Sequence, residues 1–151
     1  MSERPEPGRP ADSPTPAPEH FRFRHPVEVR FRDLDPMGHA HHSLPLIYFE
    51  EARAAYWRDV AGQAGLTGIG YIMGEVSVRY HARIHFPQRL EVLARVSRLG
   101  GKSWSMQYQL RGAGGELLAS GESTQVMYDY AAGASTPISD EVRERIRRFE
   151  G

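Results

Sequence analysis

Residues 46–62 read "LIYFEEARAAYWRDVAG", and this stretch decides the fold because its apolar residues have a helical period. The residues of one face are spaced three or four positions apart: Phe49, Ala52, Tyr56 and Val60. Such spacing places all four on one side of a helix of about five turns. The sequence therefore predicts one long helix with a buried face.

The limits of this helix can also be read from the sequence. Ser43 is a suitable N-cap, and Pro45 lies in the first turn, where a missing N–H group does no harm. Gly62 and Gly65 follow the last apolar residue and are expected to end the helix. We therefore expect the helix to span about residues 44–61.

Outside this helix, most of the chain changes to a period of two. Apolar and polar residues alternate in five segments: 25–31, where Val27, Val29 and Phe31 face one side, and 75–84, 90–99, 103–110 and 116–130. Short glycine-rich connections, "GGKS" and "GAGGE", suit antiparallel hairpins between the last three. Residues 139–150 return to helical spacing. The order predicts an α+β fold with one antiparallel sheet packed on the long helix.

Composition limits the classes of protein that fit. The 151 residues suit one domain, and the 19 basic and 19 acidic residues balance, so no basic surface for nucleic acid is expected. Cysteine is absent, which excludes disulfides and a thiol nucleophile. No apolar run is long enough for a membrane span, and no signal-peptide core is present, so a cytoplasmic protein is expected. Residues 1–20 hold six of the 11 prolines and predict a disordered tail before a domain at 21–151.

The segment 32–43, "RDLDPMGHAHHS", carries the densest group of reactive side chains and directly precedes the long helix. A helix N-terminus presents unpaired N–H groups and a partial positive charge, which stabilise an oxyanion. Asp35 comes eight residues before the expected N-cap, and Gly38 allows a tight turn between them. A carboxylate and an oxyanion site could thus share one pocket. This combination suits attack on an activated acyl group such as a thioester.

Other interpretations of the same segment remain open. Asp33, Asp35, His39, His41 and His42 could hold zinc, iron or manganese, although their spacing does not match the familiar helical zinc motifs. A capping or turn-forming carboxylate is the favoured interpretation of Asp33. On the helix, Glu50 and Arg53 are three residues apart and could form a local ion pair.

Two longer stretches resemble a known family. "VRFRDLDPMGHAHHSLPLIYFEEAR" at 29–53 and "YHARIHFPQRLEVLARVSRLGGKSW" at 80–104 are similar to the acyl-CoA thioesterases of the 4-hydroxybenzoyl-CoA thioesterase group. The resemblance covers nearly the whole chain from about Phe21. It implies a hotdog fold, which is a curved antiparallel five-stranded sheet around one central long helix. It also implies hydrolysis of acyl-CoA thioesters without a cofactor or metal.

The resemblance further assigns roles to individual residues. The catalytic aspartate of the family falls on Asp35, and the residue whose backbone N–H polarises the thioester carbonyl falls on His42, whose side chain is a further candidate for catalysis. Five residues are expected to contact the substrate: Gly38, His39, Glu50, Lys102 and Ser103. Lys102 and Ser103 follow Gly100 and Gly101, where some relatives carry arginines that contact coenzyme A phosphates. Because these glycines cannot form such contacts with their side chains, the chain must hold the phosphates of coenzyme A with other residues.

A single sheet with one helix leaves apolar surface and strand edges open, which a second copy can cover. We therefore expect a homodimer or a homotetramer. Two alternatives to an acyl-CoA thioesterase remain: a hotdog domain that binds acyl-CoA without catalysis, and a thioesterase acting on acyl-carrier-protein thioesters. Neither nucleic acid nor a membrane is an expected partner.

Overall fold

A computed structural model describes residues 15–63 and 70–151. Two α-helices are present, α1 (Leu44–Asp59) and α2 (Asp140–Glu150), with short 3₁₀ turns at Pro18–His20 and Phe31–Asp33. The strands are β1 (Phe23–Glu28), β2 (Tyr71–Tyr80), β3 (Arg89–Leu99), β4 (Ser103–Gly112), β5 (Leu117–Asp129) and β6 (Ala134–Ser135). None of the described helices is both long and apolar enough to cross a membrane.

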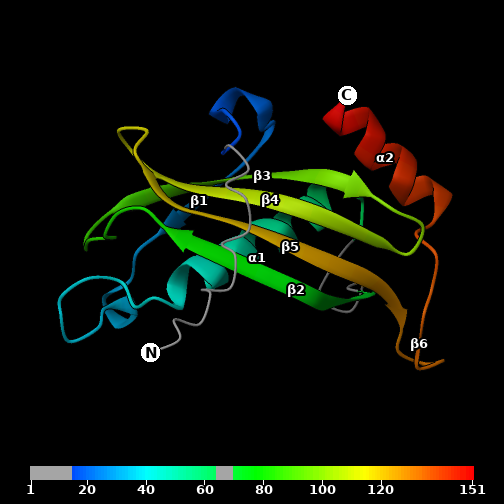
Figure 1. The fold of residues 1–151 in the computed structure, drawn as a ribbon, viewed down its shortest axis with the longest axis horizontal. Helices are drawn as coiled ribbons and strands as arrows, with labels where there is room; N and C mark the ends of the chain where they lie inside the picture. The colour runs from blue at the N-terminus through cyan, green and yellow to red at the C-terminus, as the bar shows by residue number, and fades with distance from the viewer. Residues whose placement is uncertain (1–14, 64–69) are drawn as a thin grey trace, which may run out of the picture.

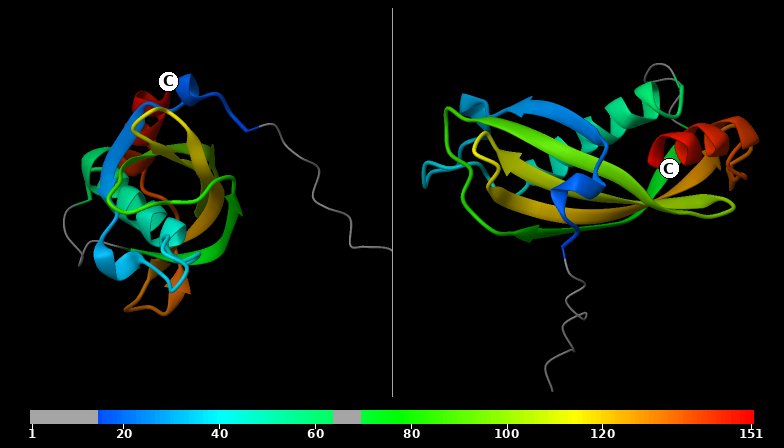
Figure 2. Two further views of the ribbon diagram at one scale, coloured as in Figure 1. Left: turned by 90° about the vertical axis from the view of Figure 1, so that its left-hand side faces the viewer. Right: turned by 90° about the horizontal axis from the view of Figure 1, so that it is seen from above.

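The five long strands form one antiparallel sheet in the order β1-β3-β4-β5-β2, and the short β6 pairs only with β5. The sheet curls around α1, which lies along its concave face (Figures 1 and 2). The structure confirms the predicted α+β hotdog architecture of five long strands around one long helix. β1 and β2 are the two edges of the sheet, so each has one side without a neighbouring strand.

The core lies between α1 and the concave face of the sheet. Phe49 stacks on Tyr108 of β4 with ring centroids 4.8 Å apart, and Trp57 stacks on Trp104 at 4.7 Å. The apolar helix positions predicted from the sequence are all buried: Phe49, Ala52, Tyr56 and Val60. The helical period therefore identified the buried face correctly.

Several predicted boundaries differ from the structure. The first strand ends at Glu28, and Phe31 lies in a 3₁₀ turn with 77% of its surface exposed, so its predicted place beside Val27 and Val29 is wrong. Strand β2 begins at Tyr71 and not near residue 75. The predicted start was too late because a register shift between Met73 and Glu75 interrupts the alternation of apolar and polar residues. The long helix ends at Asp59, and Gly62 follows with a positive φ of 74°. Gly65 lies outside the described residues.

Both ends of the described chain pack against the sheet, and the C-terminal helix also contacts α1. Of the expected tail, residues 1–14 lie outside the described residues, and Pro16 accepts a hydrogen bond from Gln109 on β4. At the other end, Ser139 caps α2 as it accepts a hydrogen bond from the Val142 N–H at 3.2 Å. Glu150, in the last turn of α2, accepts hydrogen bonds from Tyr56 of α1 at 2.6 Å and from the Val96 N–H of β3 at 2.8 Å. A single carboxylate thus joins three elements.

Candidate active site

Asp35 lies in a tight turn that connects the first 3₁₀ segment after β1 to α1. Its carboxylate accepts a hydrogen bond from the Met37 N–H at 2.9 Å, and its backbone carbonyl accepts one from the Gly38 N–H at 3.0 Å. Gly38 has a positive φ of 85°, a conformation that favours glycine. The Asp35 side chain is only 8% exposed, and its free oxygen Oδ2 lies 3.7 Å from Nδ1 of His39. The turn therefore holds one carboxylate oxygen in place and leaves the other for chemistry.

Asp33, two residues earlier, has a different environment. Its Oδ2 accepts a hydrogen bond from the Arg30 N–H at 2.8 Å and another from the buried Tyr48 hydroxyl at 2.9 Å. Burial and the neighbouring Asp33 carboxylate both raise the pKa of Tyr48. Asp33 thus fixes the turn to the first half of α1, in agreement with the structural role predicted for it.

The N-terminus of α1 faces the same space as Asp35. Ser43 occupies the N-cap position, but its side chain does not cap the helix and instead contacts Nδ1 of His41 at 2.9 Å. The His41 N–H is bonded to the Asp33 carbonyl at 2.9 Å, whereas the His42 N–H has no hydrogen-bond acceptor among the described residues. An unpaired N–H at the start of a helix is suited to bind an oxyanion.

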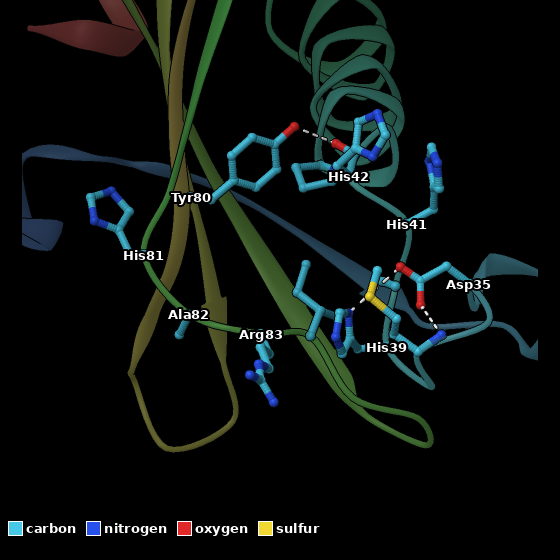
Figure 3. Close-up of a pocket in the computed structure, with 12 residues that line it drawn as sticks. Asp35, His39, His41, His42, Tyr80, His81, Ala82 and Arg83 are labelled. Atoms are coloured by element: carbon cyan, nitrogen blue, oxygen red, sulfur yellow. Dashed lines mark hydrogen bonds and ion pairs between the residues drawn. The ribbon is translucent and has the colours of Figure 1, made fainter.

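A pocket of about 360 Å³ joins these groups. One wall is the segment from Asp35 to Pro45, and the other is formed by the end of β2 and the residues after it, Tyr80 to Ile84 (Figure 3). Two hydrogen bonds tie the walls together: the Ala40 N–H donates to the Ile84 carbonyl at 2.9 Å, and the Tyr80 hydroxyl donates to the His42 carbonyl. Asp35, His39 and His42 all line this pocket.

The other predicted substrate contacts lie elsewhere in the described chain. Glu50 is exposed on α1, outside the pocket lining, and it forms no ion pair with Arg53. Lys102 and Ser103 lie at the β3–β4 hairpin, where Ser103 pairs with Val126 near the start of β2. The pocket lies at the end of β2, so these two residues are at the opposite end of the sheet within one chain. Their role in substrate binding stays a prediction.

Sequence reasoning missed the second wall of the pocket. The sequence placed residues 75–84 in an alternating strand and gave none of them a role in the site, yet Tyr80, His81 and Arg83 line the pocket. Burial, and then the neighbouring charge of Arg79, lower the pKa of His81, whose Nε2 is 2.8 Å from the Ser120 hydroxyl. These residues lie 45 to 48 positions after Asp35, and no local pattern indicates that the two segments meet.

The metal hypothesis required several of these side chains to converge. Among residues 15–63 and 70–151, no group of three or more His, Asp or Glu side chains is arranged to hold a metal ion. The imidazole of His41 faces His42, with ring centroids 3.9 Å apart, and contacts Ser43 rather than Asp35. The carboxylate of Asp33 is engaged with Tyr48.

The fold and this site define the class of the protein. A carboxylate and an unpaired helix N–H line one pocket in a hotdog fold, a combination suited to acyl transfer from a thioester. In agreement, residues 29–146 match the model of the thioesterase-like superfamily. The chain belongs to this superfamily.

Individual relatives are consistent with this assignment. A thioesterase from Thermus thermophilus, solved with coenzyme A and Zn, is 33% identical, with a TM-score of 0.79 over 88% of this chain and 98% of that chain. The PA5185 protein of Pseudomonas aeruginosa PAO1 is 27% identical, with a TM-score of 0.80 over 90% of this chain and 96% of that chain. The uncharacterized protein YsmA of Bacillus subtilis is 25% identical over 83% of this chain and 86% of its own length.

Proposed function

We propose that this protein hydrolyses acyl-CoA thioesters to a free carboxylic acid and coenzyme A, as its resemblance to the 4-hydroxybenzoyl-CoA thioesterase group implies. The observation that carries the proposal is the shared pocket of Asp35 and the unpaired His42 N–H. The thioester carbonyl oxygen would accept a hydrogen bond from this N–H group. Asp35 would lie on the other side of the carbonyl carbon, in the same pocket.

Asp35 can act in two ways in this pocket. As a general base it takes a proton from water, the water oxygen bonds to the carbonyl carbon, the C–S bond breaks, and the thiolate recovers the proton. As a nucleophile its free oxygen Oδ2 bonds to the carbonyl carbon and expels the thiolate, and water then hydrolyses the mixed anhydride. Neither route needs a strong general acid, because the thiolate of a thiol with a pKa of about 8.5 is a good leaving group.

Coenzyme A is the preferred carrier for two reasons. A 33% identical thioesterase was solved with coenzyme A bound. In this chain, the side of the pocket formed by residues 80–84 includes Arg83, an exposed cation suited to a phosphate group. An acyl-carrier-protein thioester would instead require a larger protein surface beside the pocket, so the two carriers can be separated by direct comparison of their hydrolysis.

A homodimer, or a dimer of two such dimers, completes the proposal. β2 is an edge strand whose concave side exposes Met73, Val76 and Tyr80, and a second copy can cover this side. If two β2 strands pair antiparallel about a two-fold axis, the start of one lies beside the end of the other. Lys102 of the partner subunit, at the β3–β4 hairpin, would then lie near the pocket. This arrangement would allow Lys102 to bind the substrate, although it is far from the pocket of its own subunit.

The proposal is tested with a panel of short, long and aromatic acyl-CoAs and a free-thiol readout. Asp35→Asn keeps the shape and removes the charge, so we expect turnover to fall about a hundredfold or more, the scale of a lost positioned base. His42→Ala should lose less because its backbone N–H remains, and Glu50→Gln tests the carboxylate on α1 that lies outside the pocket lining. Near-full activity of Asp35→Asn with loss in Glu50→Gln would contradict the assignment.

Two further results would point to other functions. Tight binding of acyl-CoA without thiol release by the wild-type protein would favour the non-catalytic acyl-CoA-binding domain. Loss of activity with a chelator, followed by recovery with one added metal, would favour the metal hypothesis.

A further inference from the structure

An exposed apolar strip leads away from the candidate active site along β2. The side chains of β2 that face α1 include Met73, Val76 and Tyr80, which are 38%, 41% and 51% exposed. At one end of the strip Tyr80 bonds to His42, and at the other end the Tyr71 ring contacts Trp57 with centroids 5.3 Å apart. The strip therefore runs from the start of α1 toward its last turn.

At the far end of this strip, polar side chains form a connected group inside the core. The Arg53 Nη1 donates to the Tyr108 hydroxyl at 3.3 Å, and that hydroxyl is 2.6 Å from the Ser123 hydroxyl. Gln125 donates from the same amide nitrogen to Ser123 and, at 3.7 Å, to the sulfur of Met73. We call Arg53, Tyr108, Ser123 and Gln125 the inner polar cluster. Three of its members are buried on β4 and β5, beside the strip in the same sheet.

The hydrogen bonds of this region are incomplete. Four buried side-chain atoms in the described residues lack a partner: Arg53 Nε, Trp57 Nε1, Trp104 Nε1 and Gln125 Oε1. These atoms gather around Tyr71, whose ring contacts both Trp57 and Trp104. Gln125 is close to the same place because its backbone pairs with Met73 on one side and with Trp104 on the other. Buried polar groups are normally satisfied, so a gathering of unsatisfied atoms in one place indicates a missing partner.

The charge of Arg53 indicates what kind of partner is missing. Arg53 is only 8% exposed, and among the described residues no carboxylate lies within 4.0 Å of its guanidinium group. A buried cation without a counter-charge is costly, and a carboxylate is the usual planar partner of a guanidinium. The amide of Gln125 can rotate so that its nitrogen replaces its unpaired oxygen. The cluster would then offer only donors to an anion.

We infer that the inner polar cluster binds a carboxylate at the far end of the acyl chain, so that the preferred substrates are thioesters of long dicarboxylic acids. This inference rests on the proposed thioesterase function. Arg53 lies nine residues after Leu44, about 14 Å along the axis of α1 at 1.5 Å per residue. Extended C–C bonds of about 1.5 Å advance about 1.25 Å each, so about eleven bonds span this distance. A twelve-carbon diacid chain fits this distance if it lies on the apolar strip, between β2 and the second copy of the proposed dimer.

Hydrolysis of dodecanedioyl-CoA is compared with that of dodecanoyl-CoA, which lacks only the terminal carboxylate. We expect wild-type kcat/KM to favour the diacid at least tenfold. In Arg53→Met the ratio of the two values should fall to near one, while Arg53→Lys should retain part of it. Arg58→Met is the matched control, because Arg58 is exposed on the same helix and its ion-pair partner is Asp59. Its ratio should equal that of the wild type.

Binding of the free acids separates this inference from the proposed function. Calorimetry with dodecanedioate and dodecanoate needs no turnover, and wild-type protein should bind the diacid at least tenfold more tightly. Circular dichroism verifies the fold of each variant, and Gln125→Met replaces Arg53→Met if that variant fails to fold. Equal affinity for both acids in the wild type overturns the inference. An unchanged preference in a folded Arg53→Met protein also overturns it, whatever the outcome of the thiol assay.

Discussion

Asp33 gives a prediction in which stability and catalysis separate. Asp33→Ala removes the acceptor of two hydrogen bonds, one from the buried Tyr48 hydroxyl at 2.9 Å and one from the Arg30 N–H at 2.8 Å. A buried donor left without an acceptor costs about 1–3 kcal/mol, and the more exposed Arg30 N–H adds about 1 kcal/mol. We therefore expect the free energy of unfolding to fall by about 2–4 kcal/mol.

The assay is thermal unfolding at one fixed protein concentration, so that any association contributes equally. At about 3 °C per kcal/mol for a chain of this size, Asp33→Ala should lower Tm by about 6–12 °C. Tyr48→Phe removes only one of the two bonds and should cost less. In the double variant, Tyr48→Phe should add little, which gives a coupling of about 1–2 kcal/mol between the two side chains.

The exposed Asp59, which pairs with Arg58, supplies the control: Asp59→Ala should move Tm by no more than about 1 °C. The folded fraction of Asp33→Ala should hydrolyse thioesters much faster than Asp35→Asn does. A Tm within 2 °C of the wild type, or additive effects of Asp33→Ala and Tyr48→Phe, would refute the role given to this carboxylate.

Three further predictions address assembly, pH and the C-terminal helix. Val76→Lys places a charge on the exposed face of the edge strand β2. Sedimentation at micromolar concentration should therefore show a monomer for this variant and a dimer for the wild type. A monomeric wild type would contradict the proposed assembly. The pKa of folded His81 lies below its usual value, so His81 stabilises the fold above about pH 6.5 and loses this contribution as the pH falls through its folded pKa. Tm of the wild type should therefore drop more from pH 7 to pH 5 than Tm of His81→Gln. Parallel curves of Tm against pH for the two proteins would contradict this prediction. Glu150→Ala leaves Tyr56 and the Val96 N–H without their acceptor and should lower the free energy of unfolding by about 1–3 kcal/mol in urea, with Glu144→Ala on the exposed side of α2 as the near-neutral control.

Most of the fold was predictable because its signals are local. The three- and four-residue spacing of Phe49, Ala52 and Tyr56 reports a buried helical face directly, and the alternation in 90–110 reports two strands joined by a short hairpin. Phe31 was assigned wrongly because the alternation of residues 25–31 continues past the point where the backbone turns. The bulge near Gly74 likewise interrupted the period that would have indicated the true start of β2.

The candidate site was predictable only on one side. Asp35 and the helix start are close in sequence, so the motif and the helix period together bring them into one pocket. The opposite wall depends on the contact between Ala40 and Ile84, which is a property of how the whole sheet curls around α1. The same holds for the inner polar cluster, whose members come from α1, β4 and β5. The spacing of residues along the chain does not predict these long-range contacts.

The position of Glu150 also bears on how the protein folds during synthesis. Its carboxylate is the acceptor for a tyrosine of α1, nearly a hundred residues earlier, and for a backbone N–H of β3, the strand between β1 and β4. A nascent chain can form α1 and pair β3 with β4 well before residue 150 has been made, because domains begin to fold from the N-terminal side. Yet the Tyr56 hydroxyl has no acceptor until α2 docks. The docking of α2 is therefore expected to follow the formation of α1 and the pairing of β3 with β4.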